Sequence, residues 1–246
     1  MILTIAFQKG GCGKTTTAAV LAQAAAHKGR RVLAIDLDPQ GNLSLALGAD
    51  TTAPGNSYKL LTMRPAAEQI QTTGQGLDTI PAAWDLATLT TSKGSARRLQ
   101  MALEPIRDNY DLIILDTPTQ AGELQYNALQ ASDGLVIPLE ADVYNLQSLY
   151  QTVNTARQIQ NTNDHLQIMG FVLTKFADAR TRFGRQLRDI MTDKAAALDV
   201  PYLGAIRYTI AVKEAAALQQ SLFDYAPRST AAADYMELYE RITQEV

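Results

Sequence analysis

The chain has 246 residues, of which 46% are hydrophobic and 19% are charged, and its formal net charge is −3. This is the composition of an ordinary globular protein that can bury a large core, which excludes the disordered and fibrous classes. The small negative charge excludes nucleic-acid binding through overall charge alone, and the single cysteine, Cys12, excludes an intrachain disulfide and a multi-cysteine metal site within one chain.

Short apolar runs alternate with stretches of helical character along most of the chain. The runs of strand length are 2–7, 31–35, 77–82, 111–116, 134–139 and 166–174. Helical patterns lie at 15–29, near 58–70, and at 95–108, 143–160, 211–222 and 229–244. Because the apolar runs are continuous rather than alternating, they predict strands that are buried on both faces. The sequence therefore predicts an α/β fold: a single doubly wound domain over residues 1–246, with a mostly parallel central sheet flanked by helices.

The sequence contains no apolar run of about 18 residues or more, the length that a membrane-spanning helix needs. The first residues lead directly into the predicted strand at 2–7, without the basic segment and cleavage site of a secretory signal. We therefore expect a cytoplasmic protein that does not enter a membrane.

The clearest motif is GGCGKT at residues 10–15, between the first predicted strand and the first predicted helix. Its glycines let backbone N–H groups approach phosphate oxygens closely, and the helix that follows adds the positive end of its dipole. In such a loop Lys14 reaches the terminal phosphates of a nucleotide and the Thr15 hydroxyl binds Mg²⁺. The alternative, a glycine-rich turn without a ligand, accounts poorly for six matching residues in this context.

A second lysine, Lys9, precedes these glycines, and Gln8 stands where the strict motif G-x-x-x-x-G-K-[ST] has its first glycine. The form K-G-G-x-G-K-T resembles the deviant Walker A motif of the ParA/MinD family of ATPases. The resemblance implies that Lys14 serves the ATP of its own subunit and that Lys9 reaches the nucleotide of the partner in an ATP-bound homodimer. The alternative for Lys9 is a solvated loop lysine. The residues expected at the phosphates are Lys9, Gly10, Gly11, Cys12, Gly13, Lys14, Thr15 and Thr16.

Three aspartates follow predicted strands. Asp36 and Asp38 lie in AIDLDPQGN at 34–42, which resembles the first switch of the family, and Asp116 ends the apolar run of YDLIILDTPT at 110–119. Carboxylates at strand ends beside a phosphate-binding loop suit a polyphosphate–Mg²⁺ site. The alternative for Asp38, which precedes a proline, is a turn cap.

The resemblance implies that Asp38 orients or activates the attacking water, and it implies the cofactors ATP and Mg²⁺. The predicted catalytic residues are Lys9, Lys14 and Asp38, and the predicted magnesium shell is Thr15, Asp36, Asp38 and Asp116. Water is the expected acceptor because no pocket for another acceptor is evident, so slow ATP hydrolysis is expected. One departure is Thr119, which replaces the second proline of the family's D-T-P-P and changes the second switch.

The base-binding position lies near the end of the sixth predicted strand, in LTKFAD. A guanine-binding protein has the pattern N-K-x-D here, whereas this chain has Thr174 for the asparagine and Ala177 for the aspartate. The sequence therefore favours ATP over GTP, with Thr174 at the nucleotide.

Other branches of the superfamily fit less well than the ParA branch. Nitrogenase-reductase-like proteins need paired cysteines, and MinD-like proteins end in a basic membrane-targeting helix, whereas AAADYMELYERITQEV at 231–246 is acidic. The resemblance to ParA extends over almost the whole chain and includes LTKFADARTRFGRQLRD at 173–189 and the segment I-x-x-x-x-x-x-x-E-A followed by D-Y-x-P-x-S-x-x-A-x-x-Y. The matching residues are Glu214, Ala215, Tyr225, Pro227, Ser229, Ala232 and Tyr235.

This resemblance implies a switch that segregates plasmid, mobile-element or chromosomal DNA through non-specific binding to double-stranded DNA and a ParB-type partner, with the protein at the nucleoid. The candidate DNA contacts are Arg180, Arg182, Arg185, Arg188, Arg207 and Lys213. A helix that begins near residue 181 places three of these arginines on one face, although a solvated charged helix is the plainer interpretation. Tyr208 and Ala211 stand where ParA relatives often have arginines, which weakens the DNA hypothesis.

Two other functions stay open. The same ATP-gated dimer could position a protein cargo or regulate another machine, with no DNA as substrate. A small-molecule enzyme of the dethiobiotin-synthetase type keeps a phosphate loop but has no need of Lys9.

Overall fold

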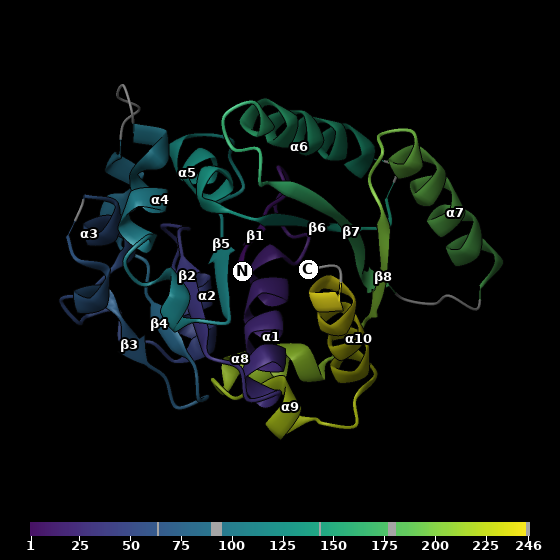
Figure 1. Cartoon of the computed structure of the whole chain (residues 1–246). Coiled ribbons are helices and arrows are strands. Elements are labelled where there is room, and N and C mark those ends of the chain that lie inside the picture. The colour runs from purple at the N-terminus through teal and green to yellow at the C-terminus, as the bar shows by residue number, and fades with distance from the viewer. Residues whose placement is uncertain (63, 90–94, 143, 177–180, 245–246) are drawn as a thin grey trace.

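The computed structural model describes residues 1–62, 64–89, 95–142, 144–176 and 181–244. Within these residues eight strands form one sheet in the order β3-β4-β2-β5-β1-β6-β7-β8, and all neighbours are parallel except β3 and β4 (Figure 1). The strands are β1 (Ile2–Ile5), β2 (Val32–Asp36), β3 (Gln71–Thr72), β4 (Asp78–Ile80), β5 (Leu112–Asp116), β6 (Gly134–Glu140), β7 (Gln167–Phe176) and β8 (Tyr202–Arg207).

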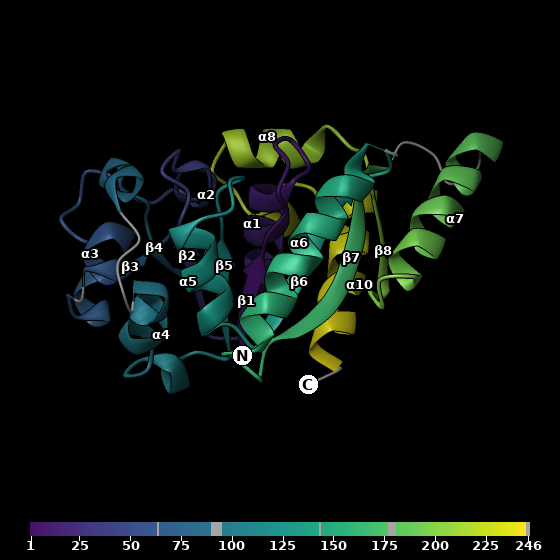
Figure 2. The ribbon, with the colours of Figure 1, turned by 90° about the horizontal axis from the view of Figure 1, so that it is seen from above.

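Helices cover both faces of the sheet. The α-helices are α1 (Lys14–His27), α2 (Asn42–Leu47), α3 (Ser57–Leu61), α4 (Arg98–Leu103), α5 (Glu123–Ala131), α6 (Asn145–Gln160), α7 (Arg182–Ala196), α8 (Ala211–Ala217), α9 (Leu222–Tyr225) and α10 (Thr230–Gln244). Short 3₁₀ helices span η1 (Ala66–Gln69), η2 (Trp84–Thr88), η3 (Ser95–Arg97) and η4 (Arg107–Asn109). Figures 1 and 2 show α1 and α10 on one face, α5 and α6 on the other, and α7 at the outer edge beyond β8.

The central strands are buried on both faces, as their continuous apolar runs predict. Every residue of β1, β2 and β5 is buried. Leu3 and Ile5 pack into the core that contains α1 and α10, whereas Ile2 packs with Leu33 and Ile113 on the opposite side. The predicted doubly wound, mostly parallel sheet is therefore confirmed.

Some elements, among them strand β8 and helix α5, were not predicted, and some predicted helices were too long. Strand β8 mixes buried, partly exposed and exposed residues. It therefore lacks the continuous apolar run by which the other strands were predicted. Helix α5 is rich in polar residues that are nevertheless buried, among them Gln125 and Asn127. The predicted helix near 58–70 is two short pieces, α3 and η1, and the one predicted at 95–108 ends at Leu103.

The helix predicted near residue 181 is confirmed as α7. The Thr181 hydroxyl accepts a hydrogen bond from the Gly184 N–H at 3.0 Å, which is the usual arrangement of an N-cap. No helix in the described part of the chain is both long enough and apolar enough to cross a membrane.

Candidate functional site

The candidate site lies at the carboxyl end of β1, where the chain turns into α1. Strand β1 pairs with β5 on one side and with β6 on the other, so the order of connections reverses at this strand. Ligands of open α/β sheets bind outside the carboxyl ends of the strands at such a reversal. The same edge receives the ends of β2, β5 and β7, which carry the other predicted site residues.

Glycines shape the loop between β1 and α1. Gly11 has φ 79° and Gly13 has φ 89°, both in the left-handed region that favours glycine. Gly13 immediately precedes the first residue of α1, so the helix N-terminus opens onto the loop. A cavity of about 450 Å³ lies over this N-terminus, and its wall includes Gly11, Gly13, Lys14, Thr15, Thr16, Asp38, Thr119, Lys175 and Lys213. The structure thus brings the loop, the first switch aspartate and the second switch to one cavity.

Lys14 is buried in the loop, with 7% of the residue exposed. Its ammonium donates hydrogen bonds to the Lys9 carbonyl and to the Thr119 hydroxyl, both at 3.2 Å. Thr119 was singled out in the sequence only as a departure from the family pattern, and a contact to Lys14 was not foreseen. The hydroxyl joins the second switch to the phosphate loop in a way that proline could not.

Lys9 has a different environment from Lys14. Its ammonium lies 3.9 Å from the Asp142 carboxylate, and the two side chains are 40% and 43% exposed. A surface pair at this distance contributes little, so Lys9 can leave it at small cost. The adjacent Cys12 is buried, its thiol donates to the Lys9 carbonyl at 3.3 Å, and burial raises its pKa.

Asp36 and Asp116 lie side by side at the ends of β2 and β5, and both are fully buried. Asp36 accepts hydrogen bonds from the Ser44 N–H at 2.8 Å, the Ser44 hydroxyl at 2.7 Å and the Asp38 N–H at 3.1 Å. Burial nevertheless raises its pKa to about 6.

Asp116 is less well satisfied. Neither of its carboxylate oxygens accepts a well-formed hydrogen bond from the part of the chain that the structure describes. Burial and the nearby Asp36 raise its pKa well above the ordinary value, and the Thr15 hydroxyl and the Lys14 charge offset this only in part. A buried carboxylate without a partner is costly, and a cation bound beside it removes that cost. The donor set of Asp116 and the Thr15 hydroxyl therefore suits a hard, oxygen-binding ion such as Mg²⁺.

Asp38 stands at the rim of the cavity and is partly exposed. One carboxylate oxygen accepts a hydrogen bond from the Gln40 N–H at 3.0 Å, and the Asp38 carbonyl accepts one from the Gly41 N–H at 2.9 Å. Asp38 therefore caps the turn between β2 and α2, as the plainer interpretation of Asp-Pro suggests, and it faces the phosphate loop as well.

Thr174 is buried, and its hydroxyl donates to the Cys12 carbonyl at 2.7 Å. It also lines a small cavity of about 70 Å³ next to the larger one, together with Thr16, Tyr208, Thr209 and Tyr235. The sequence predicts Thr174 at the nucleotide. In the structure Thr174 lies against the phosphate loop and lines the small cavity, but it is not among the residues that line the larger one.

A third cavity, of about 440 Å³, lies on the other side of Asp38. It is bordered by the first switch, by η2 and by the second switch up to Leu124. Trp84, which is the only tryptophan of the chain, lines it and is 73% exposed. Sequence reasoning gave this residue no part in the site.

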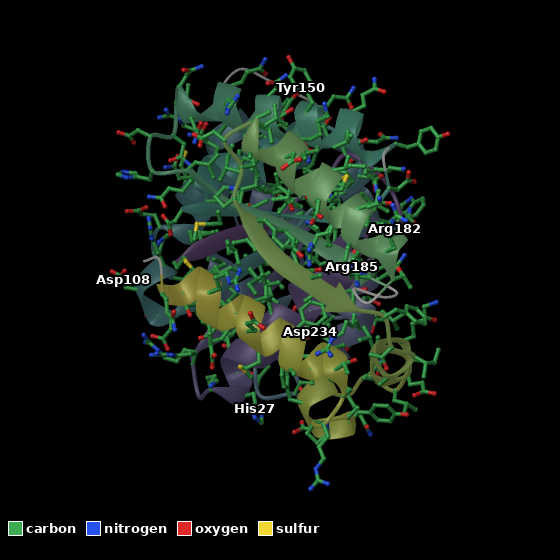
Figure 3. The ribbon with its side chains drawn as sticks, turned by 90° about the vertical axis from the view of Figure 1, so that its right-hand side faces the viewer. His27, Asp108, Tyr150, Arg182, Arg185 and Asp234 are labelled. Atoms are coloured by element: carbon green, nitrogen blue, oxygen red, sulfur yellow. The ribbon has the colours of Figure 1, made fainter. Side chains whose placement is uncertain are left out.

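The candidate DNA contacts are spread over two regions. Arg182 and Arg185 are exposed on α7, and Figure 3 shows them on the same side of the molecule as Asp234 of α10. Arg188 pairs with Asp189 at 3.0 Å. Arg180 lies outside the described residues, and Lys213 is part of the wall of the phosphate-loop cavity.

Arg207 is held by Asp234. Its guanidinium donates to both carboxylate oxygens, at 2.9 and 2.6 Å, and its backbone N–H donates to the same carboxylate at 2.8 Å. Asp234 is only 11% exposed, and this pair raises the pKa of Arg207. A guanidinium held in this way joins β8 to α10, which competes with any contact to phosphate.

Comparison with known proteins agrees with this geometry. The family model described as an AAA domain matches residues 1–168. The chain is 38% identical to the sporulation initiation inhibitor protein Soj of Bacillus subtilis, with 98% of this chain and 97% of the relative covered. It is 32% identical to the chromosome-partitioning ATPase Soj of Thermus thermophilus, with 99% and 96% covered.

Solved structures share the fold. Cobyrinic acid a,c-diamide synthase from Mycobacterium smegmatis, with bound ADP and magnesium, superimposes with a TM-score of 0.82 at 30% identity and covers 97% of this chain and 92% of its own. The septum site-determining protein MinD from Pyrococcus horikoshii, complexed with Mg-ADP, gives a TM-score of 0.80 at 25% identity, with 99% and 96% covered. By sequence and by structure, this chain belongs to the ParA/MinD-type family of P-loop ATPases.

Proposed function

We propose that this protein binds ATP with Mg²⁺, forms a homodimer in the ATP state and hydrolyses ATP slowly, as a switch that segregates DNA. Two observations support nucleotide binding. The phosphate loop opens onto a cavity near the buried Asp116, whose carboxylate accepts no well-formed hydrogen bond from the described residues, and a relative of the same fold was solved with bound ADP and magnesium.

The site supplies what phosphoryl transfer needs. Lys14, the loop amides and the N-terminus of α1 place positive charge around the phosphates. Thr15 and Asp116 would hold Mg²⁺, with Asp36 and Asp38 completing the predicted shell. When bound, the ion neutralises negative charge on the terminal phosphates. Asp38, at the cavity rim, is the carboxylate we assign to orienting the attacking water, with its turn fixing its position.

The observation that supports a homodimer is the contrast between the environments of Lys14 and Lys9. Lys14 is buried and bound within its own loop, whereas Lys9 is 40% exposed and, among the described residues, forms only a loose ion pair with Asp142. A long cationic side chain exposed on the phosphate loop can reach a nucleotide bound by a second copy. A lysine with only its own phosphates to serve would gain nothing from this outward position.

The DNA substrate is supported by the relatives that carry chromosome partitioning in their names. The exposed arginines of α7 would contact DNA phosphates, and a dimer would double their number. In this proposal a ParB-type partner stimulates hydrolysis, and the protein acts in the cytoplasm on the nucleoid.

A second candidate function is the positioning of a protein cargo by the same ATP-gated dimer. The observation that favours it is the Arg207–Asp234 pair, because one of the candidate DNA contacts is already committed within the fold. Tyr208 and Ala211, at positions where ParA relatives often have arginines, point in the same direction.

The test is the mass in solution of the Asp38→Ala variant, measured by light scattering with Mg²⁺ and either ATP or ADP. Plasmid DNA is then added at low and at high salt. The proposal expects a dimer with ATP, a monomer with ADP, and retention of DNA at low salt only. A dimer that ignores DNA would favour the protein cargo, and a monomer under every condition would contradict the switch.

A further inference from the structure

Two consecutive residues at the end of β7 hold two consecutive carbonyl groups of the phosphate loop. The Thr174 hydroxyl donates to the Cys12 carbonyl at 2.7 Å, and the Lys175 ammonium donates to the Gly11 carbonyl at 2.5 Å. Lys175 was not among the predicted site residues. It is a third lysine on the wall of the phosphate-loop cavity, beside Lys14 and Lys213.

Lys175 is itself fixed in place. Its ammonium pairs with the Glu140 carboxylate at 2.5 Å, so the ends of β6 and β7 are joined at the loop. Its backbone adopts φ 50°, a left-handed conformation that is strained for a residue with a Cβ. Such a conformation persists where surrounding contacts hold it. The charge of Lys175 is already paired with that of Glu140, in contrast to Lys14, whose hydrogen-bond partners among the described residues are the neutral Lys9 carbonyl and Thr119 hydroxyl.

The geometry of the peptide bond gives these contacts a consequence for the phosphate site. In a planar trans peptide the carbonyl of one residue and the N–H of the next point in opposite directions. Holding the Gly11 carbonyl therefore directs the Cys12 N–H to the other side of the loop, and holding the Cys12 carbonyl does the same for the Gly13 N–H. Successive N–H groups turned to one side form an anion-binding nest.

We propose that Lys175 is a positioning residue of the phosphate loop, which together with Thr174 presets the N–H groups of Cys12 and Gly13 for the nucleotide phosphates. The inference rests on the proposed function, because a nucleotide is the ligand. Lys175 acts through the loop backbone and not on the terminal phosphate. Its effect is therefore the same for ATP and ADP, and it strengthens binding without changing the chemical step.

The test is calorimetric binding of ATP and of ADP, each with Mg²⁺, to the full chain and its variants. Lys175→Met removes the hydrogen-bond donors while it keeps the side-chain length nearly constant. It is expected to weaken the binding of both nucleotides about tenfold. Lys175→Arg keeps donors and charge, so it is expected to restore most of the affinity. A second pair of variants tests the neighbouring Cys12 carbonyl: Thr174→Val removes the donor and is expected to weaken binding, whereas Thr174→Ser keeps the donor and is expected to retain it.

The matched control is Lys28→Met. Lys28 has the same side-chain exposure as Lys175, 44%, and also makes an ion pair, with Glu240 at 2.7 Å, but it lies at the opposite end of α1. This control is expected to leave both affinities unchanged. In steady-state ATP hydrolysis, Lys175→Met is expected to raise KM and to leave kcat unaltered.

Two results would overturn the inference. Weaker ATP binding with unchanged ADP binding would mean that Lys175 touches the third phosphate directly, and unchanged affinity for both would mean that its contact is idle. If Lys175→Met fails to fold, Glu140→Gln decides: it is expected to weaken the binding of both nucleotides about 1.5- to 5-fold, and unchanged affinity for both would overturn the inference. A parent protein that binds neither nucleotide would instead refute the proposed function, and the two failures are thereby distinguished.

Discussion

Asp36 of β2 lies directly opposite Asp116 of β5 in the register of the sheet, yet only one of the two carboxylates has its hydrogen bonds. Asp36 accepts three, from Ser44 and Asp38, whereas the described residues offer Asp116 none of good geometry. The fold thus stabilises the carboxylate of one member of the pair by hydrogen bonds and leaves the other for a bound cation. This asymmetry suggests where removal of a charge changes stability and where it changes ligand binding.

Asp116→Asn is expected to stabilise the nucleotide-free protein at neutral pH by about 1–3 kcal/mol, because it removes a buried charge that accepts no well-formed hydrogen bond from the described residues. Burial raises the pKa of Asp116 in the fold, so its penalty is present above that raised pKa and vanishes below the ordinary value of 3.8, where the carboxyl group is protonated in both states. The stabilisation should therefore appear in urea unfolding at pH ~7 and disappear near pH ~3. A gain of equal size at both pH values would contradict this origin. The variant should also lose the Mg²⁺ dependence of ATP binding.

Thr119→Val is expected to tighten nucleotide binding about 2- to 10-fold. In the free protein the Thr119 hydroxyl accepts a hydrogen bond from the Lys14 ammonium, which must turn to the phosphates when a nucleotide binds. Removing the acceptor destabilises only the free state. The measurement is ATP and ADP affinity by calorimetry, with Thr119→Ser as the control that keeps the hydroxyl. Weaker binding by the valine variant would show that the hydroxyl serves the bound state.

Lys9→Ala and Lys14→Ala are expected to separate dimerisation from nucleotide binding. The Lys14 variant should lose ATP binding, because its ammonium is the buried cation of the loop. The Lys9 variant should bind ATP with its own loop intact but remain a monomer. Binding is followed by calorimetry and mass by light scattering.

The fluorescence of Trp84 gives an independent signal for the dimer, because this single tryptophan is 73% exposed beside Asp38 and the second switch. A dimer of the Lys9 variant with parental stability would remove Lys9 from its proposed contact with the partner.

Replacement of Arg182, Arg185 and Arg188 by alanine is expected to weaken DNA binding and to flatten its salt dependence. Each lost phosphate contact should reduce the steepness of log affinity against log salt by about 0.9. Fluorescence anisotropy of a labelled duplex at several salt concentrations measures both quantities. Arg107→Ala with Arg241→Ala is the matched control, since those arginines form surface pairs on other elements. An unchanged slope would return α7 to the plainer interpretation of a solvated charged helix.

The parts of the fold that could be predicted are those whose signal is local. Continuous apolar runs predict the buried central strands, and glycines and a lysine at fixed spacing predict the phosphate loop. Strand β8 and helix α5 escaped because their burial comes from neighbours: β8 is an edge strand with partly exposed positions, and α5 buries polar side chains such as Asn127, which bonds to Glu123 and to the Leu99 N–H.

The same distinction holds within the site. Lys14, Thr15, Asp36 and Asp116 follow strands or glycines and were expected together. The contacts of Thr119 and Lys175 were not, because each depends on a partner more than 100 residues away in the chain. The two hydrogen bonds from the Arg207 guanidinium to Asp234 could not be predicted from the sequence either, because an arginine near a basic segment suggests a DNA contact.

The order of the strands has a consequence for how the protein is made. β1 is synthesised before the other strands of the sheet, but its partners β5 and β6 begin only at Leu112 and Gly134. At a synthesis rate of about 5–20 residues per second, the nascent apolar strand and its phosphate loop wait several seconds for the neighbours that bury them. The site at the centre of the sheet is therefore assembled late, only after more than half of the chain has been synthesised.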